Sequence, residues 1–204
     1  MAPDQWAYEN QAWQRGYRSI AGIDEVGRGP LAGPVVAAAV ILPEALPDLG
    51  ITDSKRLSAK KRAAVYDQIY HHARAVGVGL VDAVEIDRIN ILRAAFAAMA
   101  MALYNLLPTP DFILIDGNQS LPVDMPQKTI IKGDQLSISI AAASIVAKVT
   151  RDRMMDVYDT DYPEYDFAAN KGYPTQAHKS AIEAHGTSPI HRMSFKGVAP
   201  VSSQ

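Results

Sequence analysis

The sequence predicts an α/β fold in which helices pack on a mixed five-stranded β-sheet. Three of the five predicted strands come early in the chain, and no long helix separates the first two. The fourth and fifth strands also follow one another closely. This order favours a mixed sheet with helices packed on it over a fully alternating parallel sheet. Residues 1–168 are expected to form the main domain, and residues 169–204 a helical C-terminal extension.

Alternating apolar and β-branched residues predict the strands, and apolar residues at three- and four-residue steps predict the helices. The strands are Ser19–Asp24, Val35–Leu42, Ala75–Val81, Phe112–Ile115 and Thr129–Lys132. The helices are Ser58–Ala73, Asp87–Leu107, Gln135–Tyr158 and Thr175–Ala184. Ser58 is expected to cap the first helix, because a serine hydroxyl can accept from the free N–H groups of a first turn.

The composition is that of a globular protein without thiol chemistry. Apolar residues make up 48% of the chain and charged residues 21%. The absence of cysteine excludes disulfides, thiolate metal sites and a cysteine nucleophile. The first residues lack the features of a signal peptide, and the apolar runs 30–42 and 94–107 are too short to span a bilayer. We therefore expect a cytoplasmic protein with no membrane partner.

Charge is unevenly distributed, although the net charge is only −2. Residues 171–204 hold four Lys or Arg, three His and one acid, whereas residues 152–166 hold six acids. Many nucleic-acid-binding proteins are basic overall, so the net charge counts mildly against that class. The basic C-terminal region leaves it open.

The segment Ala21–Pro34, AGIDEVGRGPLAGP, carries the first chemical signal. Neighbouring side chains on a regular strand point to opposite faces, so Asp24 and Glu25 can share a site only if the backbone turns there. The glycines of Gly27–Gly29 make such a turn plausible and let a ligand approach the backbone. A solvated turn after a strand is the simpler alternative. The glycine spacing fits neither a P-loop nor a dinucleotide fingerprint.

Two more acids occupy positions where a site is possible. Asp116 ends the apolar strand before Gly117, where it is either a turn residue or a ligand at the tip of a strand. Asp134 precedes a predicted helix, and helix capping is its strongest alternative. Together with Asp24 and Glu25 they give four carboxylates, which we name the carboxylate cluster. Such hard oxygen ligands favour Mg²⁺ or Mn²⁺, and two ions about 4 Å apart can promote phosphodiester hydrolysis.

Candidate substrate contacts lie in the last third of the chain. Ser144, Lys148 and Arg151 share one helix face, which could equally be an ordinary surface stripe. Tyr173 lies between Gly172 and Pro174, and Arg192 follows in HRMSF. An aromatic ring beside basic residues suits stacking on a nucleotide, although a structural tyrosine would give the same pattern.

In these motifs the sequence resembles the ribonuclease HII family. The matching stretches, in order from Ala21 to Phe195, are IDEVGRGPLAGPVVAAAV, TDSKRLS, EIDRINILRAAFAAM, LIDGN, IKGDQLSISIAAASIVAKVTRD, KGYPTQAH and HRMSF. The resemblance implies a ribonuclease H-like sheet with flanking helices and a helical C-terminal extension. It also implies an endonuclease that cuts RNA–DNA hybrids, and duplex DNA with embedded ribonucleotides, on the 5′ side of a ribonucleotide. Two-metal catalysis would leave 3′-OH and 5′-phosphate ends.

The resemblance also assigns roles to residues. The carboxylate cluster would be catalytic and would bind Mg²⁺ or Mn²⁺. Gly27, Arg28 and Gly29 would sense the ribonucleotide 2′-OH, a group that is both donor and acceptor. Tyr173 would stack on the neighbouring deoxyribose. Ser144 is expected to contact the substrate, and Lys148, Arg151 and Arg192 are expected to hold phosphates.

Two other functional classes remain open from the residues alone. A non-catalytic nucleic-acid-binding module would explain the basic region and Tyr173 but not the four acids. A nucleotide-binding oxidoreductase or kinase would depend on the glycine loop, whose spacing does not fit. A monomer is expected, and the tail after Phe195 shows no partner-binding peptide.

Overall fold

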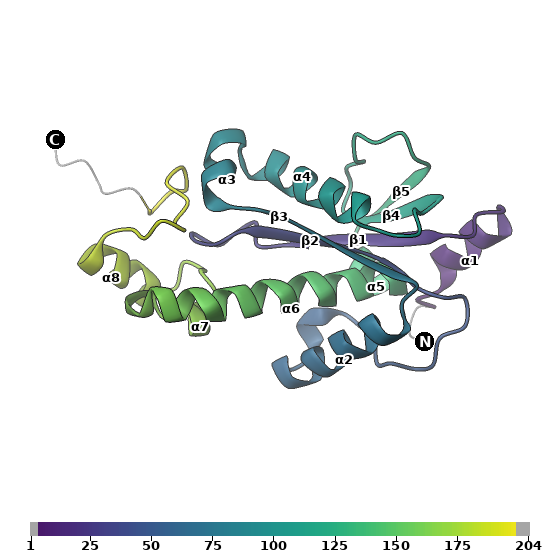
Figure 1. The fold of residues 1–204 in the computed structure, drawn as a ribbon, viewed down its shortest axis with the longest axis horizontal. Coiled ribbons are helices and arrows are strands. Elements are labelled where there is room, and N and C mark those ends of the chain that lie inside the picture. The colour runs from purple at the N-terminus through teal and green to yellow at the C-terminus, as the bar shows by residue number, and fades with distance from the viewer. Residues whose placement is uncertain (1–3, 199–204) are drawn as a thin grey trace.

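The computed structural model describes residues 4–198, which form a mixed five-stranded sheet with helices on both faces (Figure 1). The strand order is β3-β2-β1-β4-β5. β1 pairs antiparallel with β2 and β2 with β3, whereas β1–β4 and β4–β5 are parallel. The predicted fold class is confirmed. The strands are β1 (Ile20–Val26), β2 (Val35–Ile41), β3 (Ala75–Val81), β4 (Phe112–Asp116) and β5 (Gln127–Ile130).

Two of the predicted helices are each two separate helices in the structure. The predicted helix Asp87–Leu107 is wrong as one unit, since Asn90 has a positive φ of 72° and caps the second part. The predicted helix Gln135–Tyr158 is likewise two helices, separated at the extended residue Ser137. The α-helices are α1 (Ala7–Gln14), α2 (Ala59–His72), α3 (Ala83–Ile89), α4 (Ile91–Tyr104), α5 (Gly133–Leu136), α6 (Ile138–Asp161), α7 (Phe167–Asn170) and α8 (Gln176–His185).

Helices α4 and α6 cover opposite faces of the sheet, so the molecule has a core on each side (Figure 1). Glycines allow both helices to lie directly on the strands. A Cβ at Gly22 would lie 2.1 Å from the backbone carbon of Ser139 in α6. A Cβ at Gly79 would lie 2.2 Å from the carbonyl oxygen of Ala98 in α4. Neither position has room for a larger residue. Gly22 therefore fixes where α6 meets β1, and Gly79 fixes where α4 meets β3.

Buried polar contacts fix the start of α6. Ser137 caps the helix by accepting from the N–H of Ile140. The Glu9 carboxylate, from α1, accepts from the Ser137 hydroxyl at 2.6 Å and from the Ser139 N–H at 3.0 Å. A carboxylate at a helix N-terminus is stabilised by the helix dipole. The N-terminal helix is therefore tied to the helix that supports β1.

The chain beyond α6 folds against the main sheet unit. Tyr165 and Phe167 pack with Ala32 and Met155 in a small separate core. Helix α7 crosses the expected boundary between residues 168 and 169. Two short 3₁₀ helices, η1 (Ser54–Arg56) and η2 (Pro163–Tyr165), complete the described elements. The end of the predicted extension, residues 199–204, lies outside the described residues. Within residues 4–198 no helix is both long and apolar enough to cross a membrane.

Candidate active site

The acids singled out in the sequence come together from three elements at one end of the sheet. Asp24 and Glu25 lie in β1, Asp116 ends β4, and Asp134 lies in α5. β1 and β4 are parallel neighbours, so their carboxyl ends lie side by side. The N–H of Gly133, in α5, donates to Asp116 Oδ1 at 2.6 Å, which ties α5 to the tip of β4. The two strands therefore bring Asp24, Glu25 and Asp116 to the same end of the sheet.

The predicted backbone turn at Asp24 and Glu25 is wrong. β1 stays regular through Val26, which pairs with Val36, and the chain turns only at Gly27, whose φ is +97°. Asp24 lies near Ser144 of α6, on one side of the sheet. Glu25 also borders the space beside Phe96 of α4, on the other side. The two acids therefore straddle the end of β1, and both border the cleft described below.

The cluster concentrates negative charge in a partly dry environment. Burial raises the pKa of the Asp24 carboxyl well above its ordinary value, and the charges of Glu25 and Asp116 raise it further. Burial also raises the pKa of Glu25, although its ion pair with Arg28 opposes this. The pKa of Asp116 is raised by burial and by the charge of Asp134, against the hydrogen bond from Gly133. A bound cation would relieve this repulsion.

Lys55 is a site residue that the sequence reasoning did not single out. Its ammonium lies 3.0 Å from Asp134 Oδ2, and this hydrogen bond raises the pKa of Lys55. Asp53 caps the short 3₁₀ helix that carries the lysine. The only signal was the stretch TDSKRLS, which the family resemblance contained but to which no residue role was attached.

Asp134 is not the helix cap that the sequence suggested. It is the second residue of α5, whose N-cap is Lys132 without a side-chain hydrogen bond. The long helix that follows is capped by Ser137 instead. Asp134 is 4% exposed and its one described side-chain partner is Lys55. Capping therefore does not explain why this carboxylate is buried beside Lys55.

A cleft of about 210 Å³ opens over the cluster. Ser144 and Lys148 of α6 border it, and so does the ring of Tyr173, which is 39% exposed. Ser144 Oγ lies 3.1 Å from Ser54 Oγ, and Lys148 Nζ lies 2.7 Å from Asp152 Oδ1. The cleft is lined by Asp24, Glu25, Val26, Ser54, Lys55, Arg62, Asp116, Ser144, Lys148 and Tyr173.

The glycine loop lies beside Tyr173, which borders the cleft. Gly29 has no close neighbour except the Tyr173 ring, whose Cε1 would lie 3.8 Å from a Cβ at Gly29. Gly27 is confined instead: a Cβ there would lie 2.5 Å from Arg151 Nε. Arg28 is half-exposed and donates to Glu25 Oε1 at 3.3 Å. The predicted sugar-sensing loop and the predicted stacking ring therefore lie next to each other.

The prediction that Arg151 and Arg192 contact phosphates is wrong. Both side chains are 0% exposed. Arg151 donates to the carbonyl oxygens of Pro34, Lys171 and Ala32 at 2.9, 2.9 and 3.0 Å. Arg192 donates to those of Gly27, Arg28, Pro30 and Gly33. Spacing on a helix face could not reveal this, because the partners are backbone oxygens of a distant loop.

The donors of the cluster match a hard divalent cation, since all four are carboxylates. Among residues 4–198, no three acidic or histidine side chains converge tightly enough to form a ready ligand set as they stand. The ammonium of Lys55 lies against one of the four carboxylates. The chemistry of the residues therefore fits a divalent ion, and binding would have to draw the side chains together.

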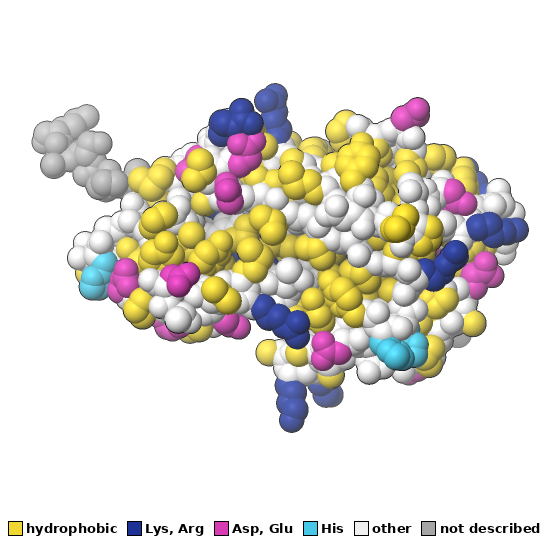
Figure 2. Space-filling view, in the orientation of Figure 1, with side chains coloured by type: hydrophobic (Ala, Val, Ile, Leu, Met, Phe, Trp, Pro, Cys, Tyr) yellow, Lys and Arg dark blue, Asp and Glu magenta, His cyan; other side chains and the backbone are white. Residues whose placement is uncertain are grey.

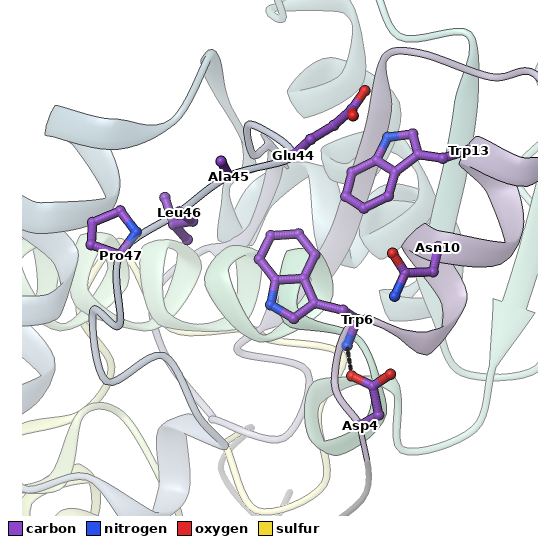
Figure 3. Close-up of a pocket in the computed structure, with 8 residues that line it drawn as sticks. All are labelled: Asp4, Trp6, Asn10, Trp13, Glu44, Ala45, Leu46 and Pro47. Carbon is purple, nitrogen blue, oxygen red and sulfur yellow. Dashed lines mark hydrogen bonds between the residues drawn. The ribbon is translucent and has the colours of Figure 1, made fainter.

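A larger cavity, of about 610 Å³, lies away from this chemistry (Figure 3). The stacked rings of Trp6 and Trp13 face the Glu44–Pro47 segment across it. This segment follows the end of β2, which is antiparallel to β1, so the cavity lies at the opposite end of the sheet from the carboxylates. On the face shown in Figure 2, Lys and Arg side chains lie in separate groups, several beside acids.

Comparison with known proteins gives a consistent result. The family model described as Ribonuclease HII matches residues 21–198. Ribonuclease HII of Syntrophus aciditrophicus (strain SB) is 55% identical over 189 residues, covering 93% of this chain and 89% of that protein. The crystal structure of ribonuclease H2 from Pyrococcus horikoshii OT3 matches with a TM-score of 0.75 and 28% identity, covering 89% and 95% of the chains. Bst-RNase HIII in complex with Mn²⁺ matches at a TM-score of 0.68 and 20% identity, covering 92% and 70%, which shows the fold alone.

Proposed function

The chain belongs to the ribonuclease HII family, and we propose that its carboxylate cluster catalyses the cleavage of RNA–DNA hybrids. Members of this family are endoribonucleases of RNA–DNA hybrids, and this chain is one of them. The observation that carries the proposal is that the acids of β1 and β4 line one cleft, while α5, which holds Asp134, is tied to the tip of β4. Acids from three separate parts of the chain are brought together against mutual repulsion, with Asp24 and Asp134 buried, which a structural role does not require.

The family uses divalent metal ions, and we propose Mg²⁺ or Mn²⁺ for this chain. Asp24, Glu25, Asp116 and Asp134 would hold the metal. When bound, it would supply Lewis-acid stabilisation of the charge that develops on the phosphate. The task of the chain's own residues would then be to hold the ion through their carboxylate oxygens. Support comes from the all-oxygen donor set and from the Mn²⁺ complex of a structurally similar protein.

We propose that the substrate is read at the contact between the glycine loop and the tyrosine. The backbone of Gly27–Gly29 would meet the 2′-OH, and Tyr173 would stack on the adjacent sugar. Gly29 and Tyr173 are near neighbours, Gly29 is exposed, and Tyr173 borders the cleft. Such a site would direct cutting to the 5′ side of a ribonucleotide, in hybrids and in duplexes with a single embedded ribonucleotide.

Ser144 and Lys148 complete the proposed substrate side. Both border the cleft from α6. Lys148 is paired with Asp152, so a phosphate would have to compete with that carboxylate for its ammonium. Arg151 and Arg192 would act only through the loop that they hold. Residues 1–168 would thus carry the catalytic groups, and residues 169–204 would form an extension that completes recognition.

The working state and compartment are also proposals. The residues that line the cleft all belong to one chain, so a monomer would suffice for activity. The relative named above comes from a bacterium, where DNA lies in the cytoplasm, and we propose the same compartment for this chain.

The test is cleavage of a DNA duplex that contains one ribonucleotide, compared in Mg²⁺, Mn²⁺ and EDTA. Wild-type protein should cut with either metal and not in EDTA, and it should leave an all-DNA duplex intact. Asp24→Asn should abolish cutting while hybrid binding survives, because charge is removed from the cluster but no phosphate contact is lost. Glu44→Gln, at the opposite end of the sheet, is the matched control. Near wild-type turnover by Asp24→Asn at saturating metal would refute the assignment.

A further inference from the structure

Two histidines form a buried pair behind the Tyr173 loop. His178 belongs to α8, and His191 lies beyond that helix in an irregular segment. Their side chains are 0% and 2% exposed, and their Nε2 atoms lie 3.0 Å apart. Neither residue lines the cleft, and neither has a part in the proposed catalysis.

The hydrogen bonds at the two ends of the pair fix which nitrogen carries each proton. The backbone N–H of Ser188 points at His191 Nδ1 from 2.9 Å, so that nitrogen must be an acceptor. Neutral His191 then carries its proton on Nε2 and donates it to His178 Nε2. His178 in turn carries its proton on Nδ1 and donates it to the carbonyl oxygen of Tyr173 at 2.9 Å. The result is a directed chain from Ser188 to Tyr173.

This chain ends on the residue whose ring borders the cleft. The Tyr173 N–H donates to the Asn170 carbonyl at 2.9 Å, and its own carbonyl also accepts from the Thr175 N–H at 2.8 Å. The third contact to the Tyr173 backbone is made by the His178 side chain, which belongs to α8. Chains of hydrogen bonds in a dry site reinforce one another, so loss of any link should loosen the tyrosine.

The surroundings keep both rings neutral. The ring of Tyr165 packs edge-on to His191 at 4.8 Å, and Phe167 packs edge-on to His178 at 5.4 Å. Burial lowers the pKa of His178, and burial together with the neighbouring imidazole lowers the pKa of His191 to about 4. A further proton on either ring would set two N–H groups against each other.

We propose that His178 and His191 are positioning residues, and that their fixed tautomers hold Tyr173 at the angle required for stacking beside the ribonucleotide. The inference rests on the proposed function of Tyr173. Neither histidine touches the cleft or the carboxylates, so neither is catalytic. The extension would contribute to recognition through the backbone of Tyr173 as well as through its ring.

A double-mutant cycle tests the proposal with the full-length protein. His178→Phe keeps an aromatic ring but removes the donor, whereas His178→Asn keeps an N–H near the place of Nδ1. Each is made with Tyr173 present and with Tyr173→Ala, and kcat/KM is measured on a duplex with one ribonucleotide. We expect His178→Phe to lower kcat/KM about fivefold with Tyr173 present and less than about twofold with Tyr173→Ala. His178→Asn should restore at least half of the loss.

The outcomes separate the inference from the function on which it rests. Equal losses from His178→Phe in both backgrounds would mean a merely structural histidine and would overturn the inference alone. Wild-type activity in Tyr173→Ala would remove the stacking assignment, and the inference with it. If His178→Phe does not fold, the ¹⁵N shifts of the wild-type histidines decide. Neutral rings protonated at His191 Nε2 and His178 Nδ1 support the proposal, and any other tautomer or a charged ring at neutral pH overturns it.

Discussion

Replacing Arg192 by lysine should loosen the glycine loop without changing the net charge. The guanidinium makes five hydrogen bonds to the carbonyl oxygens of Gly27, Arg28, Pro30 and Gly33. An ammonium group has three donors and no planar fork, so at least two of the five bonds are lost. The loop carbonyls left without a partner are shielded from water by the same packing that buries Arg192.

The magnitude follows from those two bonds. A hydrogen bond lost while its acceptor stays buried costs about 1–2 kcal/mol, which gives about 2–4 kcal/mol for Arg192→Lys. A domain of this size loses roughly 2–4 °C of melting temperature for each kcal/mol, so the midpoint should fall by roughly 4–16 °C. Cleavage should weaken as well, because the loop that meets the substrate is less well held.

Thermal and urea unfolding, followed by circular dichroism, measure the effect. Arg93→Lys is the matched control, since Arg93 is exposed on α4, and it should change stability by less than about 0.5 kcal/mol. The salt dependence of hybrid binding is measured in parallel. An unchanged melting curve for Arg192→Lys would refute the reasoning from burial, whereas the salt slope should be the same in both proteins because lysine keeps the charge.

Four further predictions follow from the site and the histidine pair. Gly29→Ala should fold normally, because a Cβ there has one neighbour at 3.8 Å. If a sugar binds close to the loop, the variant should cut at least about tenfold more slowly, and normal rates would refute that contact. Gly27→Ala should instead melt lower, because its φ is +97° and its Cβ would lie 2.5 Å from a buried guanidinium; an unchanged melting curve would contradict this. Lys55→Met should tighten Mn²⁺ binding in calorimetry by about threefold or more, since its ammonium competes for a carboxylate 3.0 Å away; equal or weaker affinity would contradict this. The folded-state pKa of His191 is lowered from 6.5 to about 4. Its contribution to the free energy of unfolding should therefore be complete above pH 6.5 and should fall by roughly 3 kcal/mol as the pH drops to 4. His191→Phe should lose less over the same range, and identical pH profiles would contradict the assignment.

The ends of β1 and β4 illustrate what a local pattern can predict. β4 ends at Asp116 beside Gly117, and the predicted strand stops one residue short of it. β1 was expected to stop at Asp24 but continues to Val26, because β2 pairs with it as far as Val36. The length of a strand is decided by its partner, and the partner is chosen by the tertiary fold. The positions of the acids could be predicted, but not the faces on which they lie.

Charged residues in helices show the opposite difficulty. Lys148 and Arg151 lie on one face of α6, yet the first borders the cleft and the second is buried against a loop. The sequence gives no means of telling the two residues apart. The acceptors of Arg151 are backbone carbonyl oxygens, which any residue type supplies. The N-terminal helix was missed for a related reason: it is held through the buried contact of Glu9 with Ser137 and has little apolar periodicity.

The close approach of α6 to β1 at Gly22 also restricts how the length of this region can vary. From the contact at Ser139 the helix runs without a break past Ser144 and Lys148 to Arg151. One residue inserted or deleted between Ser139 and Arg151 would rotate everything beyond it by about 100°. The guanidinium would then leave the loop carbonyls, and the cleft would lose its lysine in the same step. A substitution in this stretch alters the contacts of one residue, whereas a change of length would disable catalysis and loop support together.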